Sequence, residues 1–531
     1  MLPDPVTVDF VTLRDASQVL NFVNVPPGFY SAAVATLDFS SASAYVVGET
    51  VEAAITDSDG NPLTGLVDIP VVAGNLTAIA RRNRILELDF DLNQSVMVDV
   101  PSNTVSVEPT LVMRVDRTDP KDFVLGGSLG AVDTAASTFV LDVETLAREP
   151  VTTLTVQVAA AAVYQVDGVP ATGSAGLAAL AALPPGTWVQ CYGAVDPLQA
   201  RFHAVYVEAG TGTYNGGSDI VEGHVVGRVG AAGADATLTV LGHSNDATHT
   251  SFLFNETFTV DVAFADTKVL RRGMVDACDT GDINVGQRVR VFGTLTGTML
   301  DATAPDAVVR MQPTRVLGFA NAMPANGTLD LELERVDLRP EGDFFWSEGG
   351  TTPPDPDSMQ LAIAGLAAGL GIDAGTAVEA RGHFTAVDDG PEDFVVTSLT
   401  NRSTAPSLVL IHDRASGLVV TPAVDTGAIS FAISGAEVAG EVAGLDQGFV
   451  GWTDLPTTPD FSAVPAGAIG LYAIRDRQTG AVGVHLAFDA FANELNAFLG
   501  LGAAIYNFGA VGQYDVTANA MSAFLVFVVV E

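Results

Sequence analysis

The sequence predicts an all-β protein in which an N-terminal β-sandwich is followed by three to four small β-barrel modules in tandem. Three observations support this prediction. One phrase, a glycine turn followed by an alternating strand, recurs along the chain. Glycine is abundant, with 53 residues in 531, and long runs of helix-forming residues are scarce. Many short strands joined by tight turns give such a composition.

The recurring phrase sets the size of the repeated module. Its first three copies end on glycine, and the fourth is looser. The copies are LPPGTWVQCYG (183–193), INVGQRVRVFG (283–293), IDAGTAVEARG (372–382) and VPAGAIGLYAI (464–474). Their turn glycines, Gly186, Gly286, Gly375 and Gly467, are 100, 89 and 92 residues apart. Solenoid repeats have periods of roughly 20–50 residues, so this recurrence indicates a repeated small domain.

Strands around each copy place the domain boundaries. Each repeat opens with a strand, a polar turn and another strand, as in FVLGGSLGAVDTAASTFVLDV (123–143). Before the repeats, VEAAITDSDGNPLTG (51–65) is a strong hairpin signal. We therefore place the β-sandwich at residues 1–118, three barrels at 119–214, 215–314 and 315–402, and a divergent fourth module with a short helix at 403–531.

Helix is expected in three places. SAGLAALAAL (174–183) and MQLAIAGLAAGLGI (359–372) each precede a glycine-turn strand, which suggests a short element that caps the barrel end. A strand in the first half of the second segment is the alternative. The longest helix is predicted at FANELNAFLGLGAAIYNF (491–508).

Two parts of the chain resemble known bacterial families. PPGFYSAAVATLDF, LELDFDLNQSV and VEPTLVMRV, within residues 22–117, resemble a lipoprotein-associated domain of unknown function (4382-like). The repeats over residues 123–401, with a divergent fourth, are similar to another domain of unknown function (5666-like), a small closed barrel of OB-like type. The resemblance implies OB-like barrels, and neither family supplies an activity.

Charge and hydropathy exclude several classes of function. The formal net charge is −39, and only two lysines are present, Lys121 and Lys268. Such a field repels phosphate backbones and anionic lipids, so we expect neither nucleic-acid binding nor electrostatic membrane docking. No stretch reaches the roughly 20 apolar residues of a membrane span. The composition favours an extracellular or cell-envelope location, and we expect that a secretion signal has been removed ahead of Met1.

No catalytic constellation is visible, so we expect a protein that is not an enzyme. The sequence contains neither a G-x-S-x-G elbow nor an H-E-x-x-H helix. The one close histidine pair, His243 and His249, lies in a polar loop. The acidic stretches 276–282 and 387–393 lie in loops, whereas glycoside hydrolysis needs two carboxylates facing each other across a cleft.

Calcium is the most reasonable ion for this chain, and we predict no other cofactor. Two short segments each gather several oxygen donors, as hard cations require. The candidate ligands are Asp57, Asp59 and Asn61 in the first segment and Asp276, Asp279 and Asp282 in the second. A plain Asp-Gly hairpin explains the first segment equally well. Cys191 and Cys278 are either two free thiols or a disulfide between modules.

The aromatic residues Phe344, Phe345 and Trp346 stand beside a Pro-rich insertion and are the candidate interaction site. They either stack on sugar rings, dock a neighbouring subunit or fill a seam between modules. The final apolar strand, 523–531, is either a core strand of the last module or a strand donated to a neighbouring subunit in a filament.

These observations favour a structural scaffold, an adhesin-like stalk or a subunit of a surface assembly. The alternative is a carbohydrate-binding surface protein that uses aromatic side chains such as Trp188, Trp346 or Trp452. The expected partners are accordingly another copy of the chain or a polysaccharide.

Overall fold

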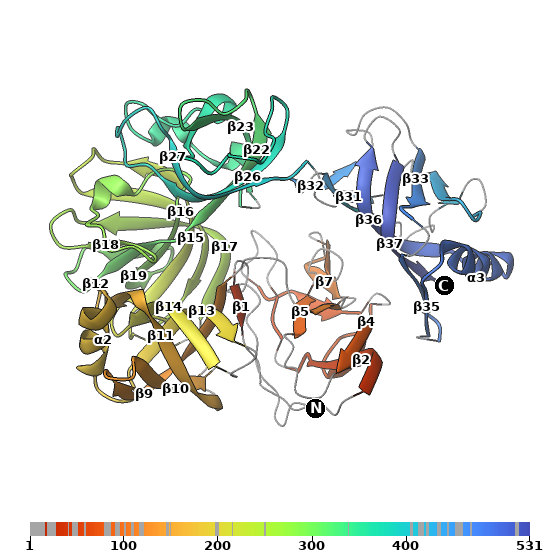
Figure 1. Cartoon of the computed structure of the whole chain (residues 1–531), viewed down its shortest axis with the longest axis horizontal. Coiled ribbons are helices and arrows are strands. Elements are labelled where there is room, and N and C mark those ends of the chain that lie inside the picture. The colour runs from red at the N-terminus through yellow and green to blue at the C-terminus, as the bar shows by residue number, and fades with distance from the viewer. Residues whose placement is uncertain are drawn as a thin grey trace. The chain divides into compact units, whose positions relative to one another are not determined.

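The structure is a computed structural model of the whole chain, and the part it describes consists mostly of β-strands. The described residues are 16–18, 28–40, 42–44, 51–57, 60–78, 86–90, 96–99, 102–107, 111–115, 122–144, 148, 150–196, 201–214, 216–248, 251–337, 339–403, 407–412, 419–420, 424–432, 437–442, 445–451, 460–467, 470–479, 481–515 and 520–531. Figure 1 labels the elements along the chain. The all-β fold with tandem modules is confirmed.

The first barrel is a five-stranded sheet closed on itself. Its strands follow the order β9 (Asp122–Asp133), β10 (Thr138–Glu144), β11 (Pro150–Val166), β14 (Arg201–Ala209) and β13 (Trp188–Asp196), and β13 pairs with β9. β1 (Ala16–Gln18) and β12 (Val169–Thr172) pair at its margin. The only parallel contact within the ring joins β11 to β14.

The second barrel repeats this order. Its ring is β15 (Asp219–Val229), β16 (Ala236–Asn245), β17 (Phe252–Val262), β20 (Met299–Ala302) and β19 (Arg288–Thr296), closed by β15 and β19. β17 and β20 form the parallel pair. Two further strands, β21 (Val308–Met311) and β18 (Lys268–Arg271), extend the sheet from β19, next to the short 3-10 helix η1 (Thr280–Asp282).

The third barrel has the same order again. Its ring is β22 (Thr314–Ala320), β23 (Thr328–Val336), β25 (Met359–Ala362), β27 (Phe394–Asn401) and β26 (Ala377–Phe384), closed by β22 and β26, with β25 and β27 parallel. β24 (Arg339–Pro340) and the 3-10 helices η2 (Glu341–Asp343), η3 (Trp346–Glu348) and η4 (Pro356–Ser358) lie between β23 and β25. Three small closed barrels therefore share one topology, which is of OB-like type.

The turn glycines of the first three copies explain why the phrase recurs. Gly186, Gly286 and Gly375 have φ of 84°, 91° and 79°, a left-handed conformation that favours glycine. The N–H of each donates to a carbonyl of the first strand of its barrel, at 2.7–2.8 Å. At the far end of the strand, a Cβ on Gly193 or Gly382 would lie 1.9 Å from a carbonyl oxygen of the neighbouring strand. Gly193 and Gly382 thus permit the close approach between the glycine-turn strand and the last strand of each ring.

The fourth module is a ten-stranded sheet whose described pairings do not close into a ring. It contains β28 (Ser407–His412), β29 (Val419–Val420), β30 (Ile429–Ala432), β31 (Glu437–Val442), β32 (Leu445–Gly451), β33 (Asp460–Pro465), β34 (Leu471–Asp476), β35 (Val482–His485), β36 (Ile505–Asp515) and β37 (Ala520–Val530). Both edges of the final strand β37 pair within this module, to β36 on one side and to β33 and β34 on the other.

The predicted fourth copy of the phrase at Gly467 is wrong. The strand after it, β34, runs parallel to the last strand β37, whereas a glycine-turn strand pairs antiparallel with both the first and the last strand of its ring. In the fourth module β36 has those pairings. It follows Leu499-Gly-Leu-Gly502, with the spacing of Leu183-Pro-Pro-Gly186, and Gly502 has φ of 93°.

Two of the three predicted helices are present, with changed bounds. Helix α2 (Gly173–Ala181) buries Leu177 and Leu180 in the core of the first barrel, as expected of a cap. The segment 359–372 is instead strand β25 followed by turns, so its helical reading is wrong. Helix α3 (Phe488–Gly500) begins earlier than predicted and stops before Gly502, because the left-handed turn there starts the next strand.

In the described parts of the N-terminal region, the regular elements are strands, joined by turns. β2 (Gly28–Asp38) pairs with β4 (Leu66–Ala78), β5 (Leu86–Phe90) with β8 (Leu111–Val115), and β7 (Thr104–Val107) with both β3 (Ala54–Thr56) and β6 (Val96–Asp99). Whether these sheets pack as a sandwich stays a prediction.

The chain divides into two compact units. The first contains residues 1–313, 344–353 and 383–389, and the second contains 314–343, 354–382 and 390–531. Among the described residues, no helix combines the length and the apolar character that a membrane crossing would require.

The corrected repeat generates a stability prediction. A Cβ added at Gly512 of β36, opposite the bulge of β37, would lie 2.0 Å from the carbonyl oxygen of Ser522. We expect Gly512→Ala to destabilise the fourth module by about 1–3 kcal/mol or more, because the two strands must separate. Gly467→Ala meets open space and should change stability by less than about 0.5 kcal/mol. Calorimetric melting of both variants tests this, and equal effects would contradict the assignment of β36.

Candidate functional site: a buried ionic joint between two barrels

The outer surface of the first barrel is buried on one side. Val189, Cys191 and Val207 point into the core, so the alternating residues of the same strands point outward. On the outside, Tyr192 of β13 lies opposite Val124 of β9 and Tyr206 of β14. These outward residues are nevertheless buried, with Tyr192 and Tyr206 only 3% and 4% exposed. A second body must therefore cover this face.

The second barrel provides that cover. The guanidinium carbon of Arg272 lies 3.7 Å from the ring centroid of Tyr192. The side-chain amide of Gln165 donates to the carbonyl of Arg271 at 2.8 Å, and Lys268 Nζ donates to the carbonyl of Asp167 at 3.0 Å. An apolar patch around Phe292 packs beside these contacts; its members are Tyr214, Ile220, Leu270, Phe292 and Val308. We call this contact region the joint.

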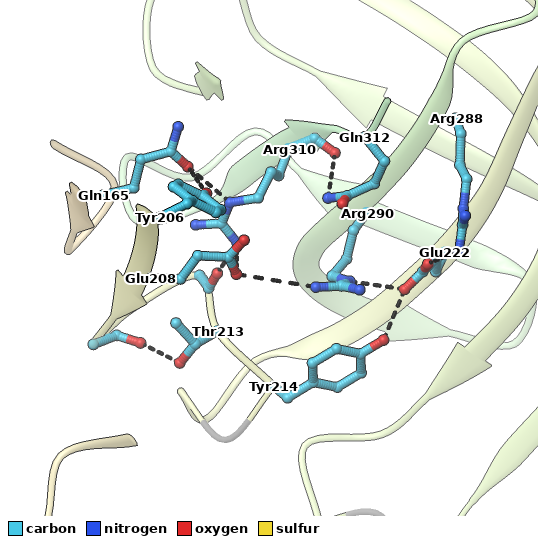
Figure 2. A network of polar contacts seen from close by, with 12 residues as sticks. Gln165, Tyr206, Glu208, Thr213, Tyr214, Glu222, Arg288, Arg290, Arg310 and Gln312 are labelled. Atoms are coloured by element: carbon cyan, nitrogen blue, oxygen red, sulfur yellow. Dashed lines mark hydrogen bonds and ion pairs between the residues drawn. The ribbon is translucent and has the colours of Figure 1, made fainter. Parts of the chain in front are cut away.

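Arg310 is the central residue of the joint. Its side chain is fully buried, although it comes from strand β21 on the outside of the second barrel. Nη1 lies 3.1 Å from Oε2 of Glu208 and also donates to the carbonyl of Gly212, while Nε donates to Oε1 of Gln165 at 2.9 Å. Figure 2 shows this guanidinium between Glu208 and Gln165 of the first barrel. One side chain thus links the second barrel, the first barrel and the connecting segment.

A second ionic group lies next to Arg310. Glu222 of β15 accepts from Arg288 Nη2 and from Arg290 Nε, each at 2.7 Å, and from the hydroxyl of Tyr214 at 2.7 Å (Figure 2). The Arg290 guanidinium lies 4.2 Å from the centroid of the Tyr214 ring and 4.0 Å from Glu208. The two groups therefore form one network with Arg290 between the glutamates.

The charges of this network hold each other in the ionised state. Burial opposes ionisation of Glu222, but Arg290 and Arg288 outweigh it and hold the pKa of that carboxyl well below its usual range. Burial opposes the charge of Arg290 in the same way, and Glu222 more than compensates, so the pKa of Arg290 is raised. Burial raises the pKa of the hydroxyl of Tyr214 well above its ordinary value, so this hydroxyl remains a neutral donor.

Such a network suits fixing an orientation better than catalysis. Removing one partner of a buried ion pair costs about 3–5 kcal/mol, because the other charge stays buried without compensation. Arginine adds directional donors in a rigid plane, whereas a lysine would act as a point charge. A rotation of one barrel against the other would break several of these contacts at once. The joint is therefore specific in geometry.

The predicted aromatic site lies apart from the joint and is mostly buried. Phe344 and Trp346 stack at 5.1 Å and contact His224 and Phe384, and only Phe345 is exposed, at 57%. The N–H of Phe345 donates to the carbonyl of Val226. Two of the three rings thus fill a contact with the second barrel inside the first unit.

The predicted calcium ligands serve local turns. Asp57 Oδ1 accepts the N–H of Asn61, and Asp59 lies outside the described residues. Asp279 and Asp282 form a reciprocal capping box around the 3-10 turn at Thr280, and Asp282 also pairs with Arg271 at 2.7 Å. Asp276 is exposed. The described part of the chain contains no cluster of three or more histidine, cysteine or acidic residues suited to a metal.

The remaining sequence candidates lie in separate places. Cys191 is a buried free thiol of the first barrel and Cys278 is a free thiol of the second. His243 stacks on Phe254 at 6.4 Å, and His249 lies outside the described residues. In the acidic stretch 387–393, burial raises the pKa of Asp393 to about 6, while its carboxylate accepts the N–H of Gln360 at 2.7 Å.

The sequence prediction did not single out any residue of the joint. Arg288 and Arg290 occupy alternate positions of the second glycine-turn strand, where the first copy has Trp188 and Gln190. Polar residues at outward positions are also the ordinary pattern of a strand with one solvent-facing side, so they do not distinguish a covered face from an exposed one. Periodicity alone cannot identify which module covers it.

The joint predicts strong coupling between Arg310 and Glu208. We expect Arg310→Met to destabilise the first unit by about 3–5 kcal/mol, because Glu208 is left buried without its partner. The double variant with Glu208→Leu should recover most of that loss, since both charges are then gone. Urea unfolding of the two single variants and the double variant gives the coupling energy. Additive effects would contradict an ion pair at the joint.

His383 predicts a pH dependence of stability in the same unit. Burial and the neighbouring Arg271 and Arg272 lower its pKa from 6.5 to about 4. The folded state therefore binds fewer protons than the unfolded chain between these values. Stability should fall by on the order of 3 kcal/mol as the pH drops from about 6.5 to about 4.

The variant His383→Gln removes this titration. Its unfolding free energy, measured by urea denaturation at several pH values, should fall less than that of the natural protein over the same window. Parallel curves for the two proteins would show that His383 does not contribute.

The comparisons with known proteins add no name to this geometry. No family model matches the sequence, and neither a curated protein nor a solved structure matches the chain. The two family resemblances therefore stay expectations, and the function has to be inferred from the contacts described above.

Proposed function

We propose that this chain is a non-enzymatic β-repeat scaffold of the extracellular space or the cell envelope, which holds its first two barrels in a fixed orientation. The observation that carries the proposal is the fully buried Arg310, which bonds Glu208 and Gln165 across the joint. Arg310, a side chain of the second barrel, is thereby buried among polar groups of the first barrel. The role of this part of the chain is to set geometry.

The chemistry of the joint supports rigidity over flexible tethering. Domains joined by ordinary polar contacts move against each other by default. Here the connecting segment is itself fixed, because Gly212 accepts from Arg310 and Tyr214 donates to Glu222. A second contact acts on the same barrel, where Glu348 Oε2 accepts the N–H of Arg228. Such contacts suit a stalk or a subunit of an assembly.

The proposed location rests on composition. A net charge of −39 with two lysines gives a surface that repels nucleic acids and anionic lipids and keeps the chain soluble. The positive charges of the network in the joint belong to arginines, and these pair with buried glutamates of the same chain. This pattern agrees with a protein that works outside the cytoplasm among other surface components.

A second candidate function is carbohydrate binding, and one observation favours it. On the β17 side of the second barrel, the rings of Phe252 and Phe254 stack at 6.0 Å, and His243 continues the row at 6.4 Å. Such a platform can accept the apolar face of a sugar ring. Trp188 and Trp346, by contrast, are buried, and Trp452 lies outside the described residues. Loss of polysaccharide retention in Phe252→Ala would support this alternative.

The rigidity of the joint can be measured in the full chain. Spin labels at Ala135→Cys in the first barrel and Met299→Cys in the second, both exposed positions, report the distance between the barrels. Cys278→Ser removes the accessible native thiol, while Cys191 is buried. We expect a narrow distance distribution in the natural joint and a broader one after Arg310→Met. A broad distribution in the natural joint would overturn the scaffold proposal.

A further inference from the structure

The fourth module carries an apolar surface on the outside of its sheet. Residues of β34, β35 and β37 form it, together with Leu486 directly after β35 and the residue inserted at the bulge of β37. We call it the outer apolar face; its residues are Leu471, Val484, Leu486, Phe524, Leu525 and Phe527. Val484, Leu486 and Phe524 are 44%, 52% and 44% exposed.

The strand register brings these side chains together. Tyr472, Val526 and Val528 belong to the core of the module, so their neighbours in sequence point to the opposite side. Leu471 lies beside Leu525, and Ala473 lies between Phe527 and Val484. The register shift at Val511/Gly512 leaves Phe524 as an extra residue next to Leu525. Helix α3 packs into the core side through Phe491 and Leu495, which leaves the outer side to the strands.

The same face of the first barrel is the one that the second barrel covers. There the glycine-turn strand β13, the last strand β14 and the third strand β11 carry Tyr192, Tyr206 and Val163 outward in one row. In the fourth module, β36, β37 and β34 correspond to β13, β14 and β11. The last strand, β37, is antiparallel to β36 and parallel to β34. The outer apolar face is thus the counterpart of the joint face.

We propose that the outer apolar face binds a second copy of this chain, face to face. The counterpart face in the first barrel is occupied by another module of the same kind, which makes a β module the expected occupant. None of the six positions carries a charge, so two copies can meet without pairing ions, unlike the joint. An identical patch on both partners suits a two-fold symmetric contact. The inference rests on the scaffold proposal and names the partner.

Charge makes a specific demand on this association. Each chain has a formal net charge of −39, so two copies repel each other at low ionic strength. Salt screens that repulsion and leaves apolar burial unchanged. Association through the outer apolar face should therefore tighten as salt is added, whereas a contact held by ion pairs would weaken.

Sedimentation velocity of the full chain tests the inference. We expect a concentration-dependent dimer between about 1 and about 100 µM that strengthens with sodium chloride. The double variant Val484→Glu with Leu486→Glu should weaken the dimer about tenfold or more, because four charges then meet in an apolar contact. Val205→Glu is the control: Val205 is a strand valine of the first barrel with 49% exposure, and its substitution adds one charge to each chain where the double variant adds two. It should leave the dimer unchanged.

Several outcomes would overturn the inference. One is a natural chain that stays monomeric over this concentration range at high salt. Another is a double variant that dimerises like the natural chain and has the same melting temperature, which shows that the variant is folded. Weakening by the control as strongly as by the double variant would point to total charge instead of this face. None of these results bears on the joint, because the spin-label distances measure it within one chain.

Discussion

The structure depends on one constraint, which is that the first strand of each barrel must pair with the strand after the glycine turn. That pairing turns an open sheet into a ring and buries an apolar interior in a module of about 90 residues. It needs a left-handed residue at the turn, supplied by Gly186 in the first barrel. Further along the same strand, Gly193 permits the close approach to the last strand, β14. This requirement explains why the phrase recurs in the sequence.

Ring closure also determines where function can reside. Because alternate residues of each strand fill the interior, the others stand outside and are free to differ between modules. In the first two barrels these outside positions hold the ionic joint. The network around Arg310 and Glu222 is costly to bury. Glu222 is compensated within the second barrel by Arg288 and Arg290, whereas Glu208 and Arg310 meet only when both barrels are in place. Its specificity therefore comes from the requirement that every charge meets its partner.

Much of the fold could be predicted from the sequence, because it follows from local requirements. Glycine turns and alternating strands gave three barrels in order, and the apolar repeat of Ser174–Leu183 gave the capping helix. The prediction of the fourth copy was wrong because the sequence around Gly467 resembles the phrase, whereas Gly502 has the left-handed conformation that the turn needs. The helix predicted over 491–508 is present but ends at Gly500, because the left-handed turn at Gly502 starts the next strand.

The candidate site was much less accessible to prediction. Arg288 and Arg290 stand in the second copy of the phrase, but their partners lie far away in sequence, and Arg310 meets Gln165 across 145 residues. Only the folded chain shows which outside positions are covered. For the aromatic residues the sequence left three alternatives open, and the burial of Phe344 and Trp346 against the second barrel agrees with the alternative of a seam between modules.

The alternation of the strands has a consequence for how such a chain can evolve. Interior and exterior residues alternate along each strand. A duplicated module can therefore keep the interior residues that determine its fold, while its exterior residues change to contact a new neighbour. The exterior residues of a few strands then determine which modules contact each other. A gene that lengthens by copying this unit would acquire a new contact by changing those residues alone, with the folding instructions inherited intact.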